Sequence, residues 1–187
     1  MQTAMNIIQR LPPSLRDPIM RGAMAAMQNP PEAIRRAALA TLPLNLILLF
    51  FPHFMKIGLL LQHNLKYDNT NPRGKDQQKR QAEHPLSGLI SRLQAAHRNS
   101  LETFPVFAVA LLACIGRQAA SKRVLKTKDP IEMLRLAFKY TAGRALYIML
   151  YVFGVNQLLG SMRTLSYFHN MYCIFKLFGL AITAPLA

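Results

Sequence analysis

The chain has 187 residues, 51% of them hydrophobic, and its 23 Lys and Arg residues against 8 Asp and Glu give a net charge of +15. The apolar fraction excludes a disordered chain, and so one-sided a charge is not typical of a soluble cytosolic domain. Length and composition together fit one membrane bundle with charged loops. Two cysteines, Cys114 and Cys173, are too few for a disulfide framework, and their apolar surroundings predict that both are buried.

Residues 1–36 form a polar N-terminal arm with five Arg, no Lys and two acidic residues. Three methionines at helical spacing predict an amphipathic helix that lies on a membrane or a partner: Met20, Met24 and Met27. The segment Asn29-Pro30-Pro31-Glu32 predicts that one helix stops and another starts there. An arm rich in arginine and poor in acids also resembles a mitochondrial transit peptide. We therefore separate the arm from a second unit, residues 37–187.

Four stretches almost free of charge follow the arm. The first runs from Ala37 to Met55 and resumes after the single charge of Lys56. A helix needs about 20 mostly apolar residues to cross a bilayer. We therefore expect four transmembrane helices, near residues 37–63, 97–116, 133–159 and 164–186. No stretch of useful length alternates with the period of a strand. The prediction is an all-α integral membrane protein, a four-transmembrane-helix bundle with both termini on one side.

The charged residues between these stretches exclude some functions. Basic residues are spread over the arm, a polar loop at 66–92 and a connector at 117–130, without the basic and aromatic cluster that binds nucleic acid. Membrane lipid head groups or an acidic protein partner explain them better. The five histidines show no metal-ligand spacing, so we expect no metal site.

A few polar residues inside the predicted spans are candidates for chemistry. Glu102 is the only acid there, and an ionisable group in a membrane is costly without a partner. We expect it to be buried and paired with one of three arginines: Arg98, Arg144 or Arg163. The third span carries one stripe of an arginine and two tyrosines, Arg144, Tyr147 and Tyr151. On these residues alone, an internal Arg98–Glu102 ion pair with interfacial tyrosines is an equally available interpretation.

Three motifs carry a resemblance to a known family. Residues His97 to Thr103 have the sequence HRNSLET, followed by FPVF. This string resembles the second-helix signature of the membrane-associated proteins in eicosanoid and glutathione metabolism (MAPEG). The family's third-helix pattern of one Arg and two aromatic positions is similar to the stripe that begins at Arg144. The start of its fourth helix resembles Arg163 to Tyr167. The resemblance covers about residues 37–186.

The resemblance implies a four-helix bundle that trimerises and binds glutathione between adjacent subunits, near one membrane face. Five residues would hold the tripeptide: Asn99, Glu102, Arg144, Tyr147 and Tyr151. Arg163 would be the catalytic residue, because a cation beside a thiol lowers its pKa and raises the thiolate fraction at neutral pH.

Two departures from the family pattern weaken the enzymatic interpretation. Ala95 stands where the family's enzymes usually carry an Arg, two residues before the signature His. The chain from Tyr151 to Arg163 is also longer than in the enzymes. The first change would remove a glutathione contact, and the second would displace the cation that faces the thiol.

Two functional hypotheses follow, and the sequence leaves open whether the protein is an enzyme. In the first, the protein is an accessory subunit, without a cofactor, of a mitochondrial inner-membrane assembly such as a respiratory-chain or ATP synthase complex. Residues 1–36 would then contact other subunits. In the alternative, it is a microsomal-type glutathione S-transferase or peroxidase, a homotrimer in the endoplasmic reticulum membrane.

Overall fold

The structure is a computed structural model of the chain, and it describes residues 11–18, 21, 29–63, 70, 74–120 and 128–183. Within these ranges every regular element is a helix. Six helices have defined bounds: α3 (Pro30–Leu39), α4 (Thr41–Gln62), α5 (Lys75–Glu83), α6 (Ser87–Ala120), α7 (Lys128–Phe153) and α8 (Gln157–Thr183). The prediction of an all-helical chain is confirmed for the described residues.

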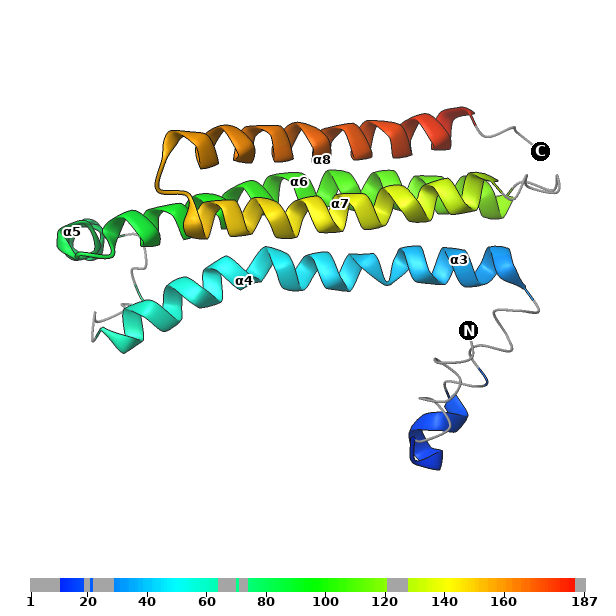
Figure 1. Cartoon of the computed structure of the whole chain (residues 1–187), viewed down its shortest axis with the longest axis horizontal. Helices are drawn as coiled ribbons and strands as arrows, with labels where there is room; N and C mark the ends of the chain where they lie inside the picture. The colour runs from blue at the N-terminus through cyan, green and yellow to red at the C-terminus, as the bar shows by residue number, and fades with distance from the viewer. Residues whose placement is uncertain are drawn as a thin grey trace.

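The four long helices pack with α6 and α7 in the middle of the bundle (Figure 1). Helix α4 contacts both of them on one side, and α8 contacts both on the other. Among the described residues α4 and α8 do not touch each other. Helix α3 starts and α8 finishes at the same end of the bundle, as expected for four antiparallel spans (Figure 1).

The four predicted spans correspond to these four helices, but three of their boundaries were clearly wrong. Helix α6 begins at Ser87 rather than near residue 97, so the predicted loop at 66–92 contains α5 and the first turns of α6. Helix α7 ends at Phe153 rather than 159, and α8 begins at Gln157 rather than 164. The reason is a short turn at residues 154–156, in which Asn156 caps α8 by accepting a hydrogen bond from the Leu159 amide at 2.9 Å.

Two stretches are long and apolar enough to cross a membrane on composition alone. They are Pro30–Gln62 and Ser87–Ala119, each 33 residues long, and within them an 18-residue part has a mean hydropathy of 1.8 and 1.5, respectively. Among the described helices α7 and α8 lack so long an apolar stretch, since their charged and polar side chains are spread along each helix. Helix α4 alone, with 22 residues, measures about 33 Å, the thickness of a bilayer core.

Apolar side chains cover the outside of the bundle as well as its core. Inside, the rings of Phe107 and Tyr140 stack with centroids 3.9 Å apart, and both cysteines are buried and free, as predicted. Outside, large apolar residues of all four long helices are exposed, among them Ile47, Phe54, Val109, Phe138, Phe168 and Phe175. An apolar exterior of this extent suits contact with lipid or with other subunits.

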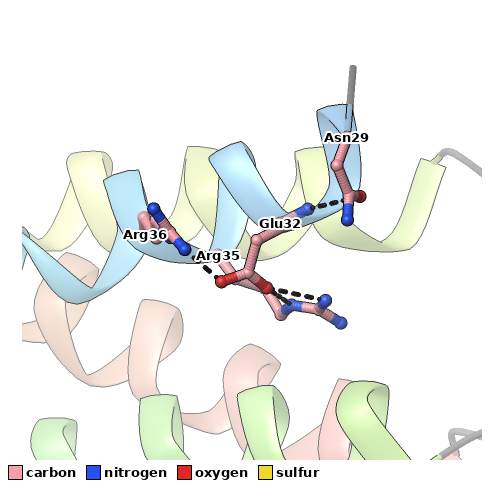
Figure 2. Close-up of polar contacts among 4 residues, drawn as sticks. All are labelled: Asn29, Glu32, Arg35 and Arg36. Atoms are coloured by element: carbon pink, nitrogen blue, oxygen red, sulfur yellow. Dashed lines mark hydrogen bonds and ion pairs between the residues drawn. The ribbon is translucent and has the colours of Figure 1, made fainter. Parts of the chain in front are cut away.

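The predicted helix start at the end of the arm is confirmed. Asn29 is the N-cap, with its side-chain oxygen accepting a hydrogen bond from the Glu32 amide at 3.4 Å, and Pro30 takes the first helical position. The Glu32 carboxylate bonds Arg35 at 2.8 Å and Arg36 at 3.0 Å (Figure 2). Hydrogen bonds from these two guanidinium groups lower the pKa of Glu32.

The rest of the arm is only partly described. The predicted methionine face, Met20, Met24 and Met27, lies outside the described residues. Helix α3 crosses the proposed boundary between residues 36 and 37 and packs against α7, with Ala38 fully buried. The last part of the arm is therefore continuous with the bundle.

Candidate functional site

The first candidate cation, Arg144, is buried between α7 and α6. Its Nη1 donates to Asn99 Oδ1 at 3.0 Å and its Nη2 to Ser100 Oγ at 2.6 Å. Its guanidinium carbon lies 4.5 Å from the centroid of the Tyr147 ring. A charge that is only 3% exposed needs such partners to offset its lost hydration. Arg144 therefore joins the two helices and orients the Asn99 amide.

The second cation, Arg163, lies against the same stripe of tyrosines. Its guanidinium carbon is 4.4 Å from the centroid of the Tyr151 ring. Tyr147 Oη donates to Tyr151 Oη at 3.3 Å, so the two phenols form a short chain. The longer spacing between Tyr151 and Arg163 does not separate them, because α8 begins at Gln157 and its first turns bring Arg163 back against α7. Arg163 is therefore not carried away from Tyr151, and its expected displacement from a bound thiol stays a prediction.

These groups surround a cavity of about 290 Å³ at the end of the bundle where α7 leads into α8. Its lining comes from α6, α7 and α8: Asn99, Tyr147, Tyr151, Arg163, Thr164 and Tyr167. One cation, three phenols and an amide favour an anionic or thiolate ligand.

Glu102 does not lie where the sequence indicated. Its side chain is exposed, and the described part of the chain offers it no ion pair. Arg98, one helical turn away, is exposed and equally unpaired within those residues. The prediction of a buried, paired Glu102 is therefore wrong. The reason is rotational: Asn99 and Ser100 face α7 and Arg144, which turns residues 98 and 102 outward.

A second cavity, of about 600 Å³, collects the outward-facing residues of α6. Arg98, Glu102 and Ala95 line it, together with Lys56 of α4. Asn99 lines both cavities. The six predicted site residues are thus divided: Asn99, Tyr147, Tyr151 and Arg163 share one cavity, Arg144 lies behind it, and Glu102 opens into the other.

Sequence reasoning missed a partner of Arg144, Ser100, and several residues that line the cavities. Ser100 adjoins Asn99 in the HRNSLET string, and Thr164 and Tyr167 lie within the Arg163 motif, so each had a signal in its neighbours. Lys56 had its own signal, as the one charge that interrupts the first apolar stretch. Among the described residues no three His, Cys, Asp or Glu side chains gather as a metal site.

The profile of the MAPEG family matches residues 37–183, most of the chain. The chain belongs to the MAPEG family. That family is a four-helix membrane bundle, so this MAPEG protein is an integral membrane protein whose long helices α4, α6, α7 and α8 correspond to the family's four. The residues before 37 are an N-terminal extension to the MAPEG domain. Neither the curated proteins nor the solved structures give a significant match to the chain.

Proposed function

We propose that this MAPEG protein is a glutathione-dependent transferase or peroxidase. The observation that supports the proposal is the position of Arg163, which lies over Tyr151 at the wall of a polar cavity that also includes Asn99. This arrangement supports the proposal, because the longer chain between Tyr151 and Arg163 still leaves the arginine against the tyrosine.

The chemistry follows from the charges at this cavity. A free thiol has a pKa near 8.5, and a neighbouring guanidinium favours the thiolate, which is the nucleophile. Tyr147 Oη donates to Tyr151 Oη, which leaves the Tyr151 proton free to donate to a sulfur anion. In a transferase the thiolate attacks an electrophilic carbon and the leaving group departs with its electron pair. In a peroxidase the thiolate attacks the terminal oxygen of a hydroperoxide and the O–O bond breaks, so the sulfur becomes a sulfenic acid and the alkoxide takes up a proton and leaves as an alcohol. A second glutathione then converts the sulfenic acid to a disulfide and releases water.

The division of the predicted residues supports a site shared between subunits of a homotrimer. Glu102 and Arg98 face outward on α6, away from the cavity of Arg163. We propose that the outward face of one subunit meets the tyrosine and arginine face of its neighbour, with glutathione between them. Unpaired charges on the outside of a membrane bundle are costly, and such an assembly would cover them.

An accessory-subunit role is the second candidate. Two observations favour it: Ala95 replaces the family's arginine, and the arm precedes the matched domain. This proposal places the protein in the mitochondrial inner membrane, bound to unlike subunits through residues 1–36. Mass measurement of the detergent-extracted particle distinguishes a homotrimer from a complex with unlike chains.

Conjugation of glutathione to an aryl halide tests the enzyme proposal. We expect turnover by the purified protein and a loss of about a hundredfold or more in Arg163→Ala, since one donor that stabilises a reacting anion is worth about 10²–10³ in rate. Arg135→Ala is the matched control, because Arg135 is exposed on α7 and pairs with Glu132 away from both cavities. Turnover unchanged by Arg163→Ala, or no turnover with any electrophile or peroxide, would contradict the proposal.

A further inference from the structure

The larger cavity has walls from three helices and lies where α4 ends and α6 begins. Lys56 comes from α4 and Gln78 from α5, while Ala95, Arg98, Asn99 and Glu102 come from α6. At about 600 Å³ it is within the size range of small-molecule sites. Most of the side chains that line this cavity are polar, whereas the exterior of the bundle is largely apolar.

Three charges at this cavity lack a counter-ion within the described residues. Neither Lys56, nor Arg98, nor Glu102 forms an ion pair there. Lys56 and Arg98 line the same cavity as Glu102, so the cavity carries one positive charge more than it balances. An anionic ligand would balance that charge, which is favourable beside a low-dielectric bundle.

The position of Ala95 gives Lys56 a specific role. Ala95 lines the same cavity and leaves its α6 wall without the arginine that the family's enzymes usually carry. Lys56 reaches this cavity from the opposite helix. A flexible lysine on α4 can therefore supply a charge that the α6 wall lacks.

We propose that Lys56 binds a carboxylate of glutathione and so replaces the missing arginine. The inference rests on the proposed function. The charges match: the cavity offers two cations and one carboxylate, and the tripeptide carries two carboxylates and one ammonium group at neutral pH. Lys56 is then a specificity-determining residue for the carboxylate, placed apart from the thiol-facing Arg163.

The test measures the Kd of glutathione for the folded oligomer by calorimetry, in the wild type and in Lys56→Met. We expect Lys56→Met to weaken binding about ten- to a hundredfold, the effect of losing one charge-assisted hydrogen bond. Lys56→Arg retains most of the affinity. Lys176→Met is the matched control, because Lys176 is exposed on α8 and stacks on Tyr172.

Two ligand analogues show whether the lysine acts through a carboxylate. One has the glycine carboxylate esterified, and the other has the γ-glutamyl carboxylate converted to an amide. Lys56→Met should not weaken further the binding of the analogue that lacks the contacted carboxylate. Equal losses for glutathione and both analogues, or no loss for glutathione, would overturn the role of Lys56 while leaving the proposed function intact. A wild-type protein that binds no glutathione would overturn both.

Discussion

Arg144 and Arg163 belong to motifs that the family relates to one ligand, yet they occupy different environments in the folded chain. Arg144 is buried and donates one hydrogen bond to Asn99 and one to Ser100. Arg163 lies beside Tyr151 at an open cavity. We therefore assign Arg144 to the support of the site and Arg163 to contact with the thiol.

Replacing Arg144 by alanine should destabilise the protein before it affects chemistry. The change removes two hydrogen bonds and leaves Asn99 and Ser100 without their guanidinium partner, at about 1.5–3 kcal/mol for each bond to a charged group. We expect a lower melting temperature in detergent for Arg144→Ala and a smaller decrease for Arg144→Lys, which keeps the charge but not the fork of donors. An Arg144→Ala protein as stable as the wild type would contradict the supporting role.

Four of the six predicted site residues line one cavity in the folded chain: Asn99, Tyr147, Tyr151 and Arg163. Their role as a ligand site stays a prediction. Glu102 was misplaced because helical spacing shows which residues share a face, but not which neighbour that face meets. The rotation of α6 about its own axis, which decides the residues that face α7, is set by the hydrogen bonds of Arg144. These bonds join residues 44 and 45 positions apart in the chain.

Helices α7 and α8 approach closely at one glycine. A Cβ at Gly143 would collide with Asn170 Oδ1 and lie 3.1 Å from His169 Cδ2. Ser166 Oγ also donates to the Gly143 carbonyl at 3.0 Å, so the contact fixes the position of one helix along the other. Because Arg163 lies one turn before Ser166, the same contact determines where Arg163 meets α7.

Gly143→Ala should therefore reduce both stability and activity. The added methyl group forces α7 and α8 apart, at a cost of about 1–3 kcal/mol for overpacking. We expect a lower melting temperature and a higher KM for glutathione. Gly179→Ala on α8 is the control, since a Cβ there meets nothing within 4 Å and alanine favours the helix. Equal behaviour of the two variants would show that the close contact does not position Arg163.

The existence of the long helices was predictable, and their ends were less so. Uncharged stretches locate the membrane helices, because charge in a bilayer is expensive. They do not reveal the turn after Phe153, because the uncharged stretch continues through it. Nor do they reveal the first turns of α6, which are polar. The Asn29–Pro30 start was predicted because a cap is a local signal that needs no tertiary contact.

The whole bundle combines an apolar exterior with polar cavities at one end. The cavity lined by Arg163 lies where α7 meets α8, and the cavity lined by Lys56 lies where α4 meets α6. Arg92 of α6 donates to the Tyr151 carbonyl at 3.0 Å, so both cavities lie at the same end of the bundle. The proposed ligand, a small thiol with carboxylates bound between subunits, would use the chemistry of both cavities.

The central claim, that this MAPEG protein activates glutathione as a thiolate through Arg163, has a direct test. The measurement is the ultraviolet absorbance of thiolate when saturating glutathione is added at neutral pH to the purified protein. We expect a thiolate band with the wild type, its loss in Arg163→Ala, and its retention in the Arg135→Ala control. Glutathione bound to the wild type without any thiolate band, or an undiminished band in Arg163→Ala, would contradict the account.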